Sequence, residues 1–296
     1  MKMSIPRLVA GSLLLFLSLQ GVQAAEDYAI RLSPPVKVGS KYGLEAKLNE
    51  VSKNVITVDG QQMRNETSEE SWRFEGKVEV QEVDAKGTPT NLSVQVQKLT
   101  VTQAGNSSEL LPSGSRLTVA VKEGKKVFEM GGKEAEPAVV KALREVITLN
   151  SENDPPDDVL FGTAERKKAG DSWPMNLEVL IQTLGKNGME LKPEDAKGSV
   201  SKLEEVVTME GKKCLKISSN IEMQNFRPPM PTWMKVKQAK ASVKSSGLFP
   251  VDGSGRLTAT LDHLMSVKAE GADPGGKTMA LHLERTLKGE KKFRYE

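Results

Sequence analysis

The chain has few of the residues that most often carry chemistry. Among its 296 residues there are one cysteine and two histidines. One cysteine excludes an internal disulfide, and histidine is the side chain that acid–base catalysis most often recruits. The sequence also lacks a Gly-x-Ser-x-Gly nucleophile elbow, a His-Glu-x-x-His zinc motif and a Gly-rich phosphate loop. We therefore expect no enzyme, no catalytic residue, no cofactor and no metal site.

Strong charge and abundant aromatic residues are missing as well. The formal net charge is +3, and aromatic residues make up 4% of the chain. Nucleic-acid binding needs clustered basic residues and stacking aromatics, so we expect no nucleic-acid partner. Pockets that hold small molecules tightly are usually rich in aromatics, which makes such a pocket an unfavoured interpretation.

No apolar run is long enough to cross a bilayer. Lys2 and Arg7 flank the start of an apolar segment, Leu8–Leu19, and the small-residue pattern Val22–Ala24 follows it. A membrane span needs roughly 20 apolar residues, whereas this shorter segment is typical of a secretory signal. We predict a cleavable signal peptide at residues 1–24, a periplasmic or extracellular location, and no transmembrane anchor after cleavage.

Alternation of apolar and polar residues dominates the rest of the sequence, and a period of two indicates strands with one apolar face. A change of phase near Lys98 predicts a β-bulge or a bend. The pattern predicts a mainly β (α+β) fold of antiparallel curved sheets or half-barrels. The clearest alternating positions are Leu92, Val94, Val96, Leu117, Val119, Leu215, Ile217, Leu257 and Leu261.

One segment departs from this pattern and predicts a helix over residues 137–149. Pro137 suits a first helical turn, and Val139, Leu143, Val146 and Ile147 form one apolar stripe. The segment after it is polar and carries two consecutive prolines, which favours a linker at residues 151–165.

The two sides of this linker are alike in sequence. Residues 38–48 resemble residues 169–181, because each segment has a glycine, two residues, an aromatic and then the alternating apolar positions of a strand. Residues 76–96 resemble residues 202–221, and each of these is a strand, a glycine turn and a second strand. We predict an internal duplication, with a first β lobe plus bridging helix at 25–150 and a second β lobe at 166–296.

These motifs, together with the segment Gly247–Gly255, resemble exported bacterial proteins of unknown function built from duplicated β lobes. Such proteins are similar in outline to the half-barrels of periplasmic lipoprotein and lipid carriers. The resemblance implies a fold and supplies no functional residues. A proline-rich segment, Asn225–Lys235, interrupts the second lobe and predicts a break in the ladder.

Three classes of function remain open. A carrier or binding module would shelter a lipid or an apolar segment of a partner, and a structural or envelope-assembly protein would have filled cores. A hydrolase using carboxylates is the third class. The apolar cavity of a carrier would be lined by Val94, Val96, Leu117 and Val119 in one lobe and by Leu215, Ile217, Leu257 and Leu261 in the other.

Three further groups of side chains are of types that can carry chemistry: two histidines, three methionines and the cysteine. His263 and His282 lie in alternating segments and are expected to face water from a strand. Met223, Met230 and Met234 would pack in a core or bind Cu(I) through their thioethers. Cys214 lies among apolar alternating positions, which favours a core residue.

Overall fold

The computed structural model describes residues 26–33, 36–150, 154–196 and 198–296, so the predicted signal peptide lies outside the described residues. They form one open antiparallel sheet of 13 strands in the order β7-β6-β5-β3-β2-β1-β13-β12-β11-β10-β9-β8, with β4 paired to β3. The predicted mainly β fold is thereby confirmed. The elements are β1 (Lys41–Val58), β2 (Gln61–Val83), β3 (Pro89–Gln103), β4 (Asn106–Leu111), β5 (Arg116–Lys122), β6 (Lys125–Met130), β7 (Lys133–Glu134), α1 (Pro137–Val146), α2 (Asp157–Leu160), β8 (Ser172–Pro174), α3 (Leu177–Lys186), the 3₁₀ turn η1 (Pro193–Ala196), β9 (Val200–Met209), β10 (Lys212–Gln224), β11 (Lys235–Pro250), β12 (Thr258–Ala272) and β13 (Thr278–Tyr295).

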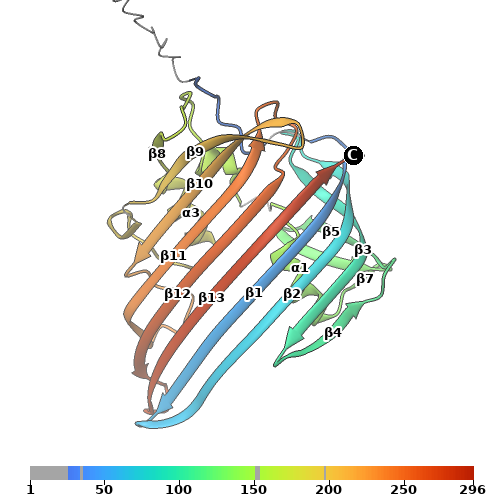
Figure 1. Ribbon diagram of the computed structural model, residues 1–296. Helices are drawn as coiled ribbons and strands as arrows, with labels where there is room; N and C mark the ends of the chain where they lie inside the picture. Colours follow the sequence, from blue (N-terminus) through green and yellow to red (C-terminus); the bar gives the residue numbers. More distant parts are fainter. Residues whose placement is uncertain (1–25, 34–35, 151–153, 197) are drawn as a thin grey trace, which may run out of the picture.

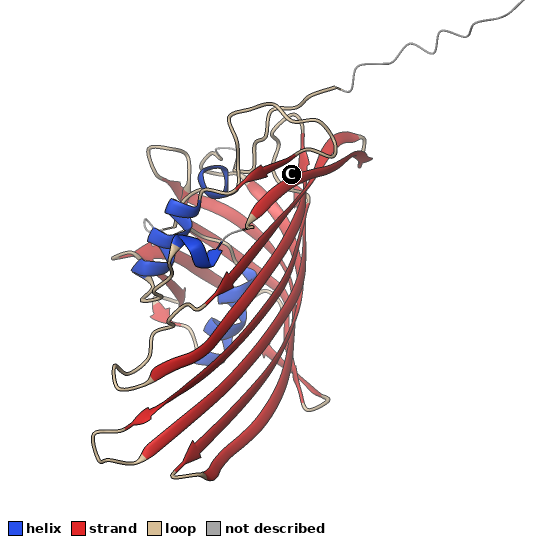
Figure 2. Cartoon of the chain, turned by 90° about the vertical axis from the view of Figure 1, so that its left-hand side faces the viewer, coloured by secondary structure: helices blue, strands red, loops and turns tan. Residues whose placement is uncertain are grey.

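The sheet is strongly curved, and its helices lie on the concave side. Figure 1 shows the long central strands in front of α1 and α3, and Figure 2 shows the helices beside the inner surface of the sheet. The lower halves of the central strands project beyond the helices in both views. The inner surface is therefore covered in its upper half and not covered by a helix in its lower half.

The sequence patterns explain the strands and their turns. The phase change near Lys98 is a bulge, because the β2–β3 register shifts between Glu75 and Gly76. A side chain at Gly76 would meet the backbone oxygen of Gln95 at 2.7 Å, so the bulge needs glycine there. The proline-rich segment falls between β10 and β11, outside the ladder as expected.

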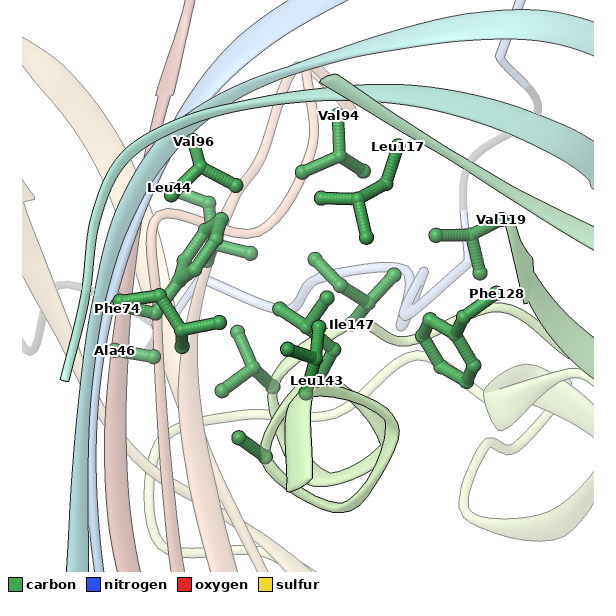
Figure 3. Packing of buried hydrophobic residues seen from close by; sticks show 14 of the residues in the cluster. Leu44, Ala46, Phe74, Val94, Val96, Leu117, Val119, Phe128, Leu143 and Ile147 are labelled. Carbon is green, nitrogen blue, oxygen red and sulfur yellow. The ribbon is translucent and has the colours of Figure 1, made fainter. Parts of the chain in front are cut away.

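The largest core lies between α1 and the first half of the sheet. Leu143 and Ile147 of the α1 region point toward Val94, Val96 and Leu117 (Figure 3). Leu143 is 0% exposed. The predicted helix is therefore present, although it ends at Val146 rather than at residue 149, and it fills the concave side of this half.

The second half contains a helix that the alternation did not predict. Residues 169–181 were expected to repeat the strand of residues 38–48, but they form the short β8 and the first half of α3. Leu177, Leu180, Ile181 and Leu184 recur at helical spacing, and the side chain of Asn176 accepts a hydrogen bond from the Val179 N–H at 3.2 Å. The strand prediction was wrong because the N-cap Asn176 and the helical spacing of the apolar residues stabilise a helix here, whereas the strand was predicted from only a few alternating positions.

The two predicted lobes share a single sheet. The matched hairpins are β2–β3 and β9–β10, with turns at Gly87 and Gly211. They lie on opposite sides of the β1–β13 pair, which joins the two halves. The internal duplication and the lobe boundaries at 25–150 and 166–296 stay predictions.

We predict that Leu143→Ala destabilises the protein by about 2–5 kcal/mol, because it leaves a cavity between α1 and the sheet. Arg144→Ala is the control, because Arg144 is exposed on the same helix and surface substitutions usually cost less than about 0.5 kcal/mol. Urea unfolding followed by circular dichroism measures both. Equal midpoints for the two variants would show that α1 does not close this core.

Candidate ligand-binding trough

The four residues expected to line a cavity in the first lobe do share one face. Val94, Val96 and Val119 are 0% exposed and Leu117 is 2% exposed, all within the core that α1 covers. Figure 3 shows them directed at Leu143 and Ile147. In this structure they line a filled core, with no open wall for a ligand.

The four residues expected in the second lobe do not lie together. Leu215 and Ile217 pack in a small core with Trp173 and Phe249. Leu261 instead packs against the core of the first half, and Leu257 is buried just before β12. The structure separates them because β12 runs beside β13, next to the first half of the sheet.

The open part of the inner surface lies lower on the central strands. Every second residue of β1 and β13 faces the concave side of the sheet. Further along this face from buried Leu48 and Leu287 lie five apolar side chains. These side chains are half-buried and belong to none of the three packed cores. We call this surface the open trough; its residues are Ile56, Val58, Met279, Leu281 and Leu283.

The two sides of the trough differ in polarity. On β12, Val267 and Ala269 are the cross-strand partners of Leu283 and Leu281; both are buried, and Val267 belongs to a packed core of the second half. The proline-rich loop closes this side, because a Cβ at Gly271 would lie 2.1 Å from the backbone oxygen of Trp233. On β2, by contrast, the inner positions are polar: Arg64, Glu66 and Ser68.

The loop that closes the trough is held by one arginine. The guanidinium of Arg227 donates to the backbone oxygens of Met234 at 3.0 Å and Pro231 at 3.1 Å. The backbone of Arg227 also exchanges two hydrogen bonds of 2.8 Å with Glu190. The boundary of the trough is therefore a hydrogen-bonded loop.

An ion network forms the upper end of the trough. Arg285 of β13 donates to Glu50 of β1 at 2.6 Å, and its Nη2 lies 3.4 Å from the Glu145 carboxylate of α1. The two carboxylates thus converge on one guanidinium, which ties α1 to the sheet. The network borders a cavity of about 670 Å³ beneath α1, which Trp72 and Lys141 also line.

His263 lies on the inner face of β12 near this network. Burial lowers the pKa of His263, and the positive charge of Arg285 lowers it further, against the opposing effects of Glu145 and Glu50. His282 lies on the opposite face of β13, 3.1 Å from Glu284. Both histidines were expected to face water, but both are half-buried, and His263 lies beside the ion network.

Two lysines meet the end of α1 inside the curved sheet. Lys126 donates to the Ile147 backbone oxygen at 3.0 Å, and the Lys291 ammonium lies 3.4 Å from the Thr148 hydroxyl. Cations are favourable at a helix C-terminus, but burial opposes their charge. Burial, reinforced by the nearby cations Lys126 and Arg256, lowers the pKa of Lys291 to about 8.

The remaining candidate side chains lie in packed surroundings. Cys214 is a free, fully buried thiol, as expected of a core residue. Met223 and Met230 belong to one apolar core, and Met234 is buried; Cu(I) binding by this group is untested. Within the described residues, no group of three or more His, Cys, Asp or Glu side chains is placed to hold a metal.

Comparisons with known proteins show little. No protein-family model matches the chain, and no curated protein matches it. A solved structure of lipovitellin, studied for its lipid–protein interactions, matches with a TM-score of 0.34 and 10% identity over 88% of this chain and 25% of that chain. The toluene transporter TodX of P. putida matches with a TM-score of 0.15 and 6% identity over 92% and 96% of the two chains.

Similarities at these TM-scores carry no argument about function, and the chain spans about a quarter of the lipovitellin chain. The resemblance to lipid-carrier half-barrels therefore stays a prediction from the sequence. Among the described residues, no helix has the length and apolar character needed to span a membrane.

We predict that the folded protein gains stability between pH 8 and pH 10 through Lys291. Its folded pKa of about 8 lies below the ordinary value of 10.5, so the unfolded chain binds this proton more tightly and stability rises with pH in that window. Above pH 10 the raised pKa values of Tyr42 and Tyr295 act in the opposite direction. Urea unfolding at each pH measures the effect.

Lys291→Met should flatten this rise, because it removes the titrating group. Lys292→Met is the matched control, since Lys292 is the exposed neighbour on the other face of β13. An unchanged pH profile in Lys291→Met would contradict the assignment.

Proposed function

We propose that this protein is an exported, non-enzymatic carrier that binds the acyl chain of a lipid or another amphiphile in the open trough. One observation carries the proposal. Five half-buried apolar side chains on the inner face of β1 and β13 belong to none of the three packed cores. A closed structural protein would cover such a surface with a helix or a loop.

The trough offers an apolar chain a suitable surface. Cross-strand pairing places Ile56 beside Leu281, and Leu281 beside Ala269, so one apolar row crosses three strands; in the next row, Asn54 of β1 lies opposite Leu283. Burial of each CH₂ group contributes about 0.8 kcal/mol. A chain of a dozen methylenes therefore gains about 10 kcal/mol before the costs of association, which are of similar size. Reversible binding is the expected outcome.

The charged end of the trough suits a polar headgroup. The cavity beneath α1 is lined by Arg285, Lys141 and Arg144 together with Glu134, Glu136, Glu145 and Glu50. An acyl chain on Leu281 and Leu283 would place its head toward Arg285, two residues further along the same face of β13. The headgroup would displace water there, and the apolar chain would supply most of the binding energy.

A structural role is the second candidate. The face of Val94, Val96, Leu117 and Val119 is a filled core, which is what a structural or envelope-assembly protein requires. The carrier proposal therefore relies on the open trough alone.

We predict that Leu281→Gln weakens binding of a fluorescent fatty-acid probe by about tenfold, because a polar amide replaces buried apolar contacts with the chain. His282→Gln is the matched control, because it changes the adjacent residue on the opposite face of the same strand. Probe titration followed by fluorescence gives both dissociation constants, with circular dichroism confirming that each variant is folded.

The wild-type protein, isolated from the compartment to which it is exported, should also show bound lipid in native mass spectrometry. Absence of bound lipid, together with no response to the probe at micromolar concentrations, would favour the structural role. Equal weakening in both variants would place any binding site outside the trough.

A further inference from the structure

The lower part of β2 has a free edge. Residues 61–69 pair with β1 on one side, whereas β3 begins to pair with β2 only at Glu70. Figure 1 shows β2 continuing below β3 with no strand beside it. All nine of these residues are exposed, and within the described part of the chain no other strand pairs with this edge. Unpaired strand edges present hydrogen-bonding groups that readily pair with another strand.

This edge fits a second copy of itself. In an antiparallel pair centred on Asn65, residue 61 faces residue 69 of the second copy across the nine-residue gap, with a regular ladder over residues 64–66. The end of β3, whose Gln103 pairs with Glu70, then abuts the β1–β2 turn of the second copy. A two-fold axis through Asn65 makes the contact isologous and closed, as in most symmetric dimers.

The charges select the same register. Opposite residues of an antiparallel pair lie on the same face of the sheet. Centring on Asn65 places Arg64 opposite Glu66 twice, and within each chain these two side chains already form an ion pair of 2.9 Å. If the pair were centred on Arg64, that arginine would lie opposite Arg64 of the second copy. If it were centred on Glu66, Glu66 would lie opposite Glu66 of the second copy. Both shifted registers bring like charges together, which is destabilising.

One exposed apolar residue lies on the same edge. Met63 is 67% exposed and would lie opposite Thr67 of the second copy. The β1–β2 register shifts between Ile56 and Thr57, which leaves Met63 at a bulge. The shift lies outside the three central residues 64–66, so the charge-paired centre of the contact keeps a regular ladder.

We infer that the protein forms a symmetric dimer through antiparallel pairing of residues 61–69 of β2 with the same residues of a second copy. The pairing joins the two sheets into one and brings the two open troughs to either side of the shared edge. The inference does not rest on the proposed function, since it is argued from the free edge of β2; Arg64 and Glu66 of that edge also form the polar side of the trough.

Charge reversal provides the first test. Arg64→Glu places glutamate opposite glutamate twice, and Glu66→Arg places arginine opposite arginine twice, so each single variant should weaken the dimer by about tenfold or more. The double variant Arg64→Glu/Glu66→Arg restores two opposite-charge pairs and should restore dimerisation. Sedimentation equilibrium gives the three dissociation constants and that of the wild-type protein, and circular dichroism confirms that each is folded.

A cysteine on the two-fold axis provides the second test. Asn65→Cys would place two thiols directly opposite each other, so mild oxidation should yield a disulfide-linked dimer on a non-reducing gel. Thr67→Cys is the matched control, because residue 67 lies opposite residue 63 and should remain largely uncrosslinked. The native Cys214 is fully buried and does not interfere.

Two results would overturn the inference. The first is a wild-type protein that remains monomeric up to millimolar concentration. The second is a dimer whose dissociation constant does not respond to either single charge reversal and that crosslinks equally through positions 65 and 67. Lipid binding by a monomer would leave the proposed function intact.

Discussion

The antiparallel pairing of β1 with β13 is the constraint on which the rest of the structure depends. The ladder runs without a register shift from Tyr42–Tyr295 to Val58–Met279, and it joins strands from opposite ends of the chain. Every strand before β1 in the sheet order comes from the first half, and every strand after β13 comes from the second. Without this ladder the chain would contain two smaller sheets, each with a long exposed edge. Because the paired residues are far apart in sequence, the ladder has a high loop-closure cost, and folds of this kind form slowly.

The length of that ladder also creates the open trough. α1 and α3 contain 10 residues each, which at about 1.5 Å per residue span about 15 Å. The 18-residue strands β1 and β13 extend to about 60 Å at about 3.3 Å per residue. The helices therefore cover part of the inner face and leave the remainder open. Arg285, held by Glu50 and Glu145, lies where the covered part ends.

Several features were predictable because they depend on local chemistry. The bulge near Lys98, the helix that starts at Pro137 and the break at the proline-rich segment each follow from residues a few positions apart. The α3 helix was missed although Asn176 and the stripe Leu177–Leu184 indicated it, because similarity to another segment was given more weight than helical spacing. The trough residues on β13 alternate as clearly as Val94 and Val96 do. Nothing local distinguishes a face that a helix will cover from one that stays open.

The sequence by itself determined that strands would dominate, which face of each strand would be apolar, and where turns and one helix would interrupt them. Hydrophobic periodicity and turn chemistry act over a few residues, so they can be recognised along the chain. Only the tertiary structure decided that Val94 and Leu117 would lie beneath α1, that Leu261 would join the core of the other half, and that Leu281 and Leu283 would remain uncovered. These outcomes follow from the pairing of β1 with β13 and from the unequal lengths of helices and strands, and both depend on contacts between residues far apart in the sequence.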